Sequence, residues 1–277
     1  MSILKYPGQK NTLARWIIGH FPPDYQKMTY LEPFFGSGCV FFSKARSNVE
    51  TINDIDSEVF NLFLQIRENP EKLINKLKST PWSREDYMLA HKDCDDPVEQ
   101  ARRFLVRAWF SRGSSARGQN GNGMRFSIKD INGGFPSFYE KLPNDIRKAT
   151  LRLKHIPGHI VQIENADAMR LMAKYNKENV LIYLDPPYVL ETRKKRRQYR
   201  HEMNGGDHAA LLEAAVSSKA KILISGYDND LYQKYLKGWN VDTAAAFDEG
   251  GNKRTEFLWF NYSAVIQQEL FKEGNTA

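Results

Sequence analysis

Short apolar runs recur along this chain, and each ends in a turn-forming or polar segment. The clearest is Val180–Leu184, which is apolar at every position and rich in β-forming residues. Such a run is typical of a strand that is buried on both faces, as in a parallel sheet. Similar runs predict further strands, one that starts at residue 29 and others over residues 51–56, 161–168, 221–227 and 256–261.

Stretches with the 3.6-residue spacing of amphipathic helices lie between these runs. The alternation of strands and helices, with one long interruption, predicts an α/β fold with a doubly wound sheet. The first predicted helix is capped by Asn11 or Thr12 and runs through Ile18, and the second begins at Cys39. The others span Ser57–Glu68, Pro70–Lys78, Pro97–Ser111 and residues 168–175, 207–217 and 231–236.

The interruption divides the 277 residues into two predicted domains. Residues 1–60 and 158–277 form the α/β domain, and residues 61–157 form an inserted, mainly helical domain. Within the insertion, the helix over Pro97–Ser111 has one apolar face with arginines around it. The segment over residues 111–126 is rich in Gly, Ser and Asn and carries three arginines, so it cannot bury a core. Loops of this length are usually functional or disordered.

The strand Val180–Leu184 runs directly into Asp185-Pro186-Pro187-Tyr188. Strand pairing stops at the prolines because they carry no N–H group. A carboxylate, free carbonyl groups and an aromatic ring therefore meet at the carboxyl end of a strand, where ligands bind in open α/β sheets. Asp-Pro alone favours a plain turn, but the full tetrapeptide after a buried strand favours a functional site.

A second candidate site follows the strand that starts at residue 29. Glu32 precedes a turn that contains Gly36 and Gly38, and glycines let the backbone approach a ligand closely. This turn is not the dinucleotide-binding fingerprint, because Phe41 stands where a third glycine would fall. The pattern therefore argues against a nicotinamide enzyme.

Two aspartates at strand ends each have two interpretations. Asp54 follows Gly38 by 16 positions, close to the spacing at which a carboxylate binds ribose hydroxyls in doubly wound sheets. Asp54 or Asp56 can instead cap the helix over Ser57–Glu68, and both roles are compatible if Asp56 is the cap. Asp167 either binds a ligand or caps the helix that follows it.

Composition narrows the function classes. The net charge of +7 makes a polyanionic partner plausible without proving one. Two cysteines in a chain of this size indicate a reducing compartment, and no Cys/His cluster has the spacing of a zinc site. There is no signal peptide and no apolar run long enough to cross a membrane. We therefore expect a cytoplasmic protein with no metal and no membrane partner.

In combination, these motifs resemble the Dam-type (alpha group) S-adenosylmethionine-dependent DNA adenine N6-methyltransferases of phages and bacteria. The resemblance rests on Lys5–Lys10, on Glu-Pro-Phe-x-Gly-x-Gly from Glu32, on Asn53–Asp56 and on Asp-Pro-Pro-Tyr. It implies a Rossmann-like methyltransferase fold with a mixed sheet and an inserted target-recognition domain. It implies catalytic roles for Asp185, Pro186 and Tyr188, and S-adenosylmethionine binding by Tyr6, Lys10, Glu32, Phe34, Gly36, Gly38, Asp54, Ile55, Asp167 and Asp185.

Double-stranded DNA is the partner that this resemblance implies. Arg can bind guanine bidentately, and Asn or Gln can bind adenine. The loop candidates for base readout are Arg112, Arg117, Gln119, Asn120, Asn122 and Arg125. The basic run after Tyr188 is usually a solvated face, but beside the catalytic edge we interpret it as a phosphate clamp formed by Lys194, Arg196, Arg197 and His201.

The predicted reaction is methyl transfer to the exocyclic N6 amine of an extruded adenine within a specific sequence. Alternatives are transfer to the N4 amine of cytosine, transfer to adenine in RNA, and a catalytically inactive DNA-binding relative. Restriction–modification with a partner endonuclease, maintenance methylation and phage self-protection all fit the sequence.

Overall fold

The computed structural model describes residues 3–6, 8, 10, 12–111, 123–125, 137–189, 200–247 and 253–263. In this part of the chain, one sheet has the strand order β3-β2-β1-β4-β5-β7-β6. Its strands are β1 (Thr29–Glu32), β2 (Val49–Asn53), β3 (Ile160–Glu164), β4 (Val180–Leu184), β5 (Lys221–Gly226), β6 (Asn240–Phe247) and β7 (Lys253–Phe260).

The sheet is mixed. β1 to β5 pair in parallel, and β7 runs antiparallel to β5 and β6. The strand order reverses between the neighbours β1 and β4, and such a switch point opens a crevice at the carboxyl ends of the strands. The predicted doubly wound α/β fold is confirmed, and its architecture places any ligand beside the residues that follow β1 and β4.

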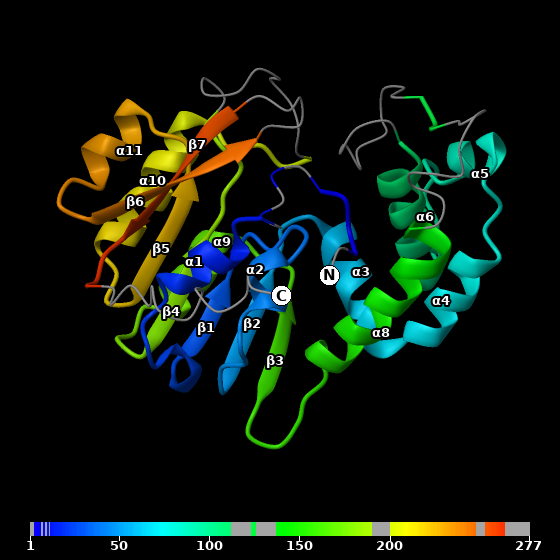
Figure 1. The fold of residues 1–277 in the computed structure, drawn as a ribbon, viewed down its shortest axis with the longest axis horizontal. Coiled ribbons are helices and arrows are strands. Elements are labelled where there is room, and N and C mark those ends of the chain that lie inside the picture. Colours follow the sequence, from blue (N-terminus) through cyan, green and yellow to red (C-terminus); the bar gives the residue numbers. More distant parts are fainter. Residues whose placement is uncertain are drawn as a thin grey trace, which may run out of the picture.

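Helices cover both faces of the sheet (Figure 1). One face is covered by α1 (Ala14–Gly19) and α2 (Cys39–Ser43), and the other by α9 (Ala168–Lys174), α10 (Gly205–Val216) and α11 (Asp230–Tyr235). In β4, Leu181 and Tyr183 join the first core, whereas Ile182 and Leu184 join the second. Successive strand residues point to opposite faces, so β4 must be apolar throughout. Burying each such side chain contributes about 1.5–3 kcal/mol.

The insertion forms a helical body beyond the β3 edge of the sheet (Figure 1). It contains α3 (Ser57–Glu68), α4 (Pro70–Lys78), α5 (Arg84–Leu89), α6 (Pro97–Phe110), the π-helical turn η2 (Ser137–Lys141) and α8 (Leu142–Leu153). The bounds predicted for α3 and α4 are confirmed, and α6 ends one residue earlier than predicted. The short helix α5 was not predicted.

The proposed division at residues 60 and 61 falls inside α3. This helix packs against α6 and α8 of the insertion and also against β3 of the sheet. Its residues Leu62, Phe63 and Ile66 belong to the same core as Tyr30 and Leu181 of the sheet. The division into two domains therefore stays a prediction, with α3 as the element that both would share.

Candidate active site

A cavity of about 540 Å³ lies at the edge of the sheet where β1, β2 and β4 end. Its wall brings together residues from the amino terminus, from the ends of β1, β2 and β4, from the start of α9, and from residues 200–211, which lead into α10. It contains every residue predicted to bind the cofactor except Gly38, namely Tyr6, Lys10, Glu32, Phe34, Gly36, Asp54, Ile55, Asp167 and Asp185. The structure thus gathers residues that are up to 179 positions apart in the sequence (Tyr6 to Asp185).

The turn after β1 depends on its two glycines. Gly36 and Gly38 have φ angles of +49° and +69°, which other residues rarely adopt. A Cβ on Gly36 would lie 3.1 Å from the ring of Tyr6, so the missing side chain lets that ring approach the cavity wall. A Cβ on Gly38 would lie 2.4 Å from Phe35. Gly38 therefore shapes the turn from behind and does not line the cavity.

Asp54 fixes this turn from the end of β2. Its Oδ2 accepts the backbone N–H of Gly36 at 2.8 Å, and its Oδ1 accepts that of Asp56 at 2.9 Å. Burial raises the pKa of Asp54 to about 7. A carboxylate offers about four lone-pair sites, so Asp54 can also accept ligand hydroxyls. Asp56 accepts the N–H of Glu58 at 3.0 Å, which confirms it as the cap of α3.

Glu32 forms the buried floor of the cavity. The hydroxyl of Tyr30 donates a hydrogen bond to it at 2.6 Å. Burial raises the pKa of Glu32 to about 8, and the neighbouring charge of Asp185 acts in the same direction. A cationic ligand group would favour the ionised form of this carboxyl.

Asp167 also lies on the cavity wall. Its Oδ1 accepts the N–H of Arg170 at 3.1 Å, so it caps α9. The capping alternative is therefore confirmed, and its role in binding a ligand stays a prediction.

Asp185 follows β4 directly and is held from two sides through the same oxygen. Its Oδ1 accepts a hydrogen bond from Ser225 Oγ at 3.0 Å and contacts Lys10 Nζ at 2.9 Å. Ser225 also shares a hydrogen bond of 2.9 Å with Tyr183. Among the residues that the structure describes, none donates to Oδ2 of Asp185. That oxygen is left for a ligand.

Lys10 is the cation of this site and is only 5% exposed. Besides Asp185, its Nζ donates to the carbonyl of Gly8 at 3.1 Å and to the hydroxyl of Tyr188. It also lies 3.5 Å from Oε1 of Glu256 in β7, which accepts the hydroxyl hydrogen bond of Tyr188. The ammonium group of Lys10 therefore contacts two carboxylates, those of Asp185 and Glu256.

Tyr188 and Pro186, the other two predicted catalytic residues, lie beside the cavity. Tyr188 is only 9% exposed, because Lys10 and Glu256 hold its hydroxyl and Tyr227 packs against its ring. Neither Tyr188 nor Pro186 lines the cavity, whereas Pro187 does. The base-stacking role of Tyr188 and the acceptor role of the Pro186 carbonyl stay predictions.

Most of the predicted DNA contacts lie outside the described residues: Arg112, Arg117, Gln119, Asn120, Asn122, Lys194, Arg196 and Arg197. His201 is exposed on the cavity wall. Arg125 is half-buried, and its Nε donates to the carbonyl of Ser111 at 2.7 Å. This hydrogen bond connects the guanidinium of Arg125 to Ser111, the C-cap residue of α6.

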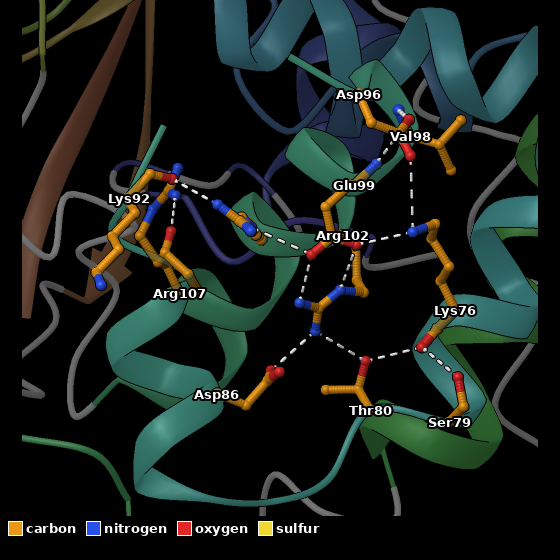
Figure 2. A network of polar contacts seen from close by, with 12 residues as sticks. Lys76, Ser79, Thr80, Asp86, Lys92, Asp96, Val98, Glu99, Arg102 and Arg107 are labelled. Atoms are coloured by element: carbon orange, nitrogen blue, oxygen red, sulfur yellow. Dashed lines mark hydrogen bonds and ion pairs between the residues drawn. The ribbon is translucent and has the colours of Figure 1, made fainter. Parts of the chain in front are cut away.

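The arginines of α6 have a structural role (Figure 2). Arg102 is 6% exposed and donates to Asp86 at 2.8 Å and to Glu99 at 2.6 Å. Arg107 is equally buried and contacts Glu58 and the carbonyl of Ala90. These contacts connect α3, α5 and α6, so the basic residues around the apolar face of α6 stabilise the insertion.

Sequence reasoning missed two residues of the site, Ser225 and Glu256. Ser225 lies at the end of β5, the strand beside β4, where the rule that ligands bind at carboxyl ends could have found it. Glu256 is the charged residue of the otherwise apolar segment Glu256–Trp259 in β7. A charge at a buried strand position is a signal of a paired or functional group.

Two searches of the described part of the chain gave negative results. Within it, no group of three or more His, Cys, Asp or Glu residues could hold a metal ion. No helix there is long and apolar enough to cross a membrane.

Comparison with solved structures finds rRNA methyltransferase aviRa from Streptomyces viridochromogenes, with 15% identity and a TM-score of 0.43 over 93% of this chain and 87% of that one. It also finds the putative methyltransferase yhhF from Escherichia coli, with 11% identity and a TM-score of 0.38 over 92% of this chain and 84% of that one.

Sequence comparison gives a more specific result. The chain is 26% identical to Type II methyltransferase M1.LlaDCHI from Lactococcus lactis subsp. cremoris over 282 residues, which cover 93% of this chain and 94% of that protein. The family model of the D12 class N6 adenine-specific DNA methyltransferases matches residues 6–247. This match spans most of the chain, which therefore belongs to the D12 class N6 adenine-specific DNA methyltransferases.

Proposed function

We propose that the cavity binds S-adenosylmethionine and that Asp185 directs the exocyclic amine of a DNA adenine toward it. The observation that carries this proposal is the arrangement of Asp185 at the cavity edge. Lys10 and Ser225 hold its Oδ1, while no described residue donates to its Oδ2. A carboxylate fixed through one oxygen presents the other as a directional acceptor for an N–H group.

The lining of the cavity fits this cofactor. Asp54, anchored to Gly36, offers carboxylate oxygens for ribose hydroxyls, and Ile55 is an exposed apolar side chain beside it, suited to an adenine ring. Glu32 lies where it can neutralise an ammonium or sulfonium group. The cavity wall carries seven acidic side chains against the cations Lys10 and Arg200, so a nucleotide phosphate fits it poorly.

When bound, S-adenosylmethionine supplies a methyl group on a positively charged sulfur. The adenine amine is a weak nucleophile, since its lone pair is delocalised into the ring. By accepting one amine N–H, Asp185 Oδ2 favours a pyramidal nitrogen whose lone pair points away from the carboxylate. Asp185 can then hold the proton that the methylated nitrogen loses. Alignment and local electrostatics account for most of the rate enhancement.

The amine is buried within a base pair in duplex DNA, so we expect the enzyme to extrude the adenine, as base-modifying enzymes do. We also expect the Pro186 carbonyl to accept the second amine proton and Tyr188 to stack on the base. The net charge of +7 suits a DNA partner. The relative from Lactococcus lactis is a Type II methyltransferase. Methylation within one short sequence, an endonuclease partner and a cytoplasmic location stay predictions.

The test is methyl transfer from labelled S-adenosylmethionine to unmethylated double-stranded DNA, with the product digested to nucleosides and the modified positions mapped. Label in N6-methyladenine within one short motif is the expected result. Label in N4-methylcytosine would overturn the choice of base. Label that enters RNA and not DNA would overturn the choice of nucleic acid.

A further inference from the structure

Glu256 occupies an unusual position for a carboxylate. It lies in β7, whose partner β5 runs in the opposite direction, with Phe257 opposite Gly226. The first half of β7 therefore reaches the edge where β4 and β5 end. Although it is charged, Glu256 is only 2% exposed. Burying an ionisable group is costly unless it is paired, so its partners should reveal what it does.

Those partners belong to the active site. Tyr188 donates its hydroxyl proton to Oε1 of Glu256, and Lys10 Nζ lies 3.5 Å from the same oxygen. Lys10 also donates to the hydroxyl of Tyr188 and contacts Oδ1 of Asp185 at 2.9 Å. A chain of contacts therefore connects Glu256 to Asp185 through one tyrosine and one lysine.

The groups that face Glu256 set its charge. Within the described residues, they are the cation Lys10, the acid Asp185 and the phenols Tyr188 and Tyr183. Burial raises the pKa of both phenols well above 10, so they stay neutral. Burial also raises the pKa of Glu256. With Glu256 ionised, two carboxylates share one ammonium and the cluster carries a net negative charge.

We propose that Glu256 is a positioning residue for methyl transfer, which acts on Asp185 through Lys10 and Tyr188. This inference rests on the function proposed above. Glu256 shares the ammonium of Lys10, so Asp185 is not neutralised by a partner of its own and remains a strong acceptor for the adenine amine. It also anchors the hydroxyl of Tyr188 and thereby holds the segment after β4 against β7.

The physical reason is competition for one carboxylate. Without the charge of Glu256, Lys10 pairs with Asp185 alone, and the substrate amine competes with a complete ion pair. Positive charge also develops on the amine during methyl transfer, and the net negative cluster stabilises that charge. Loss of the Glu256 charge strengthens the Lys10–Asp185 pair and removes part of the stabilisation of the amine. Both consequences should lower the rate of the chemical step more than they weaken cofactor binding.

The test compares Glu256→Gln with wild type in single-turnover methyl transfer to double-stranded DNA across pH. The substitution keeps an acceptor for Tyr188 and removes the charge. At pH 8 we expect the rate to fall by about tenfold to 100-fold. As pH falls, Glu256 of the wild type takes up a proton, so the ratio of the two rates should shrink toward one. Titrations of groups that do not interact with Glu256 affect both proteins alike and cancel in the ratio.

A matched control is Glu213→Gln. Glu213 likewise accepts a tyrosine hydroxyl, from Tyr235 at 3.0 Å, but on the exposed surface of α10. This variant should transfer methyl groups at the wild-type rate. Calorimetry with S-adenosylmethionine and thermal unfolding complete the comparison, and Glu256→Gln should bind the cofactor within a few-fold of wild type.

If Glu256→Gln does not fold, the single-turnover rates of Glu256→Asp and Tyr188→Phe are measured in its place. Glu256→Asp should keep the pH dependence of the wild type. Tyr188→Phe should slow transfer because it removes the hydroxyl that connects Glu256 to Lys10, which leaves only the 3.5 Å contact between them. The inference would be overturned if the ratio of the wild-type rate to the Glu256→Gln rate stayed constant with pH. It would also be overturned if Glu256→Gln transferred methyl groups within threefold of the wild-type rate. A wild-type protein that methylates no DNA would overturn the proposed function instead.

Discussion

The charge network of the insertion and the charge network of the active site are built from the same kinds of side chain. Around α6, three cations contact three carboxylates, and the two signs balance. The members are Lys76, Arg102 and Arg103 on one side and Asp86, Asp96 and Glu99 on the other. No member lines the cavity. The network connects helices and holds α4, α5 and α6 together (Figure 2).

At the active site the signs do not balance. A single ammonium, that of Lys10, contacts Asp185 and Glu256, and Glu32 lies nearby on the cavity wall. Lys10, Glu32 and Glu256 are buried, whereas the insertion network also includes the exposed side chain of Asp96. At the active site, an excess of carboxylate faces a cavity. A folded chain that maintains such an imbalance stores electrostatic free energy, which a cationic ligand can release.

The comparison teaches that burial of charges alone does not mark a functional site. Arg102 is as buried as Lys10, and both are paired. What separates the two networks is the balance of charge and the access to a cavity. Four changes should break one network while sparing the other.

The largest effect is expected for Asp185→Ala. It removes the acceptor for the adenine amine, so methyl transfer should fall by roughly 10³-fold or more. Lys10 keeps Glu256 as a partner, so the protein should stay folded and bind the cofactor. Labelled transfer and calorimetry measure the two properties, and activity within tenfold of wild type would refute the role of Asp185.

Arg102→Met should mainly reduce stability. It removes the arginine that pairs with Asp86 and Glu99, although Lys76 still contacts Glu99. Breaking a buried pair costs about 3–5 kcal/mol, and we expect about 3 kcal/mol because part of the network remains. Urea unfolding measures the loss.

Arg147→Met is the matched control for Arg102→Met, because Arg147 pairs with Glu71 on the open surface. Surface pairs of this kind contribute little, so its unfolding curve should overlay that of the wild type. An Arg102→Met curve that also overlays would show that the network around α6 does not stabilise the fold.

Asp54→Ala should weaken cofactor binding. It removes the acceptor for the N–H groups of Gly36 and Asp56 and the proposed ribose contact. A hydrogen bond to a charged group contributes about 1.5–3 kcal/mol, so affinity should drop about tenfold to 150-fold. Ser83→Ala removes a helix cap at α5, away from the cavity, and should leave affinity unchanged. Equal affinity in Asp54→Ala and wild type would remove Asp54 from the site.

The smallest effect is the pH dependence of cofactor binding. Burial raises the pKa of Glu32 to about 8 and that of Asp54 to about 7, so both are largely protonated below these values. Cationic and hydroxyl groups of the cofactor favour the ionised forms, so binding should release protons. Affinity should rise with pH between about 6 and 8, by at most about tenfold per unit for each linked proton.

The same shifts fix the sign of a stability change without cofactor. The unfolded chain loses the Glu32 proton near the ordinary pKa of 4.5, whereas the folded chain keeps it up to about 8. Stability should therefore decrease as pH rises across that window. Glu32→Gln should flatten both profiles, and profiles that are unchanged in Glu32→Gln would show that another group is responsible.

Local patterns were enough to predict most of the fold. β4 is apolar throughout because both of its faces are buried, and α3 and α4 have clear caps or proline starts. β6 was missed because Asn240–Phe247 is polar and alanine-rich, with little of the β-branched character of a strand. Nearly all of the residues predicted to bind the cofactor lie on the cavity wall.

Contacts between distant segments could not be predicted. The antiparallel pairing of β7 brings Glu256 to the active site, and no local pattern encodes that register. The burial of Tyr188 depends on the same contact, so the base-stacking role proposed from the sequence did not anticipate it. The structural role of Arg102 likewise depends on Asp86, which lies 16 residues earlier.

The most direct test is the single-turnover rate of methyl transfer per folded molecule, measured side by side for Asp185→Ala and Arg102→Met. The account predicts that Asp185→Ala loses the rate and keeps its unfolding midpoint, whereas Arg102→Met keeps the rate and loses stability. If Arg102→Met slowed the chemical step as much as Asp185→Ala, or if Asp185→Ala kept the wild-type rate, the distinction between a balanced structural network and an unbalanced catalytic one would be wrong.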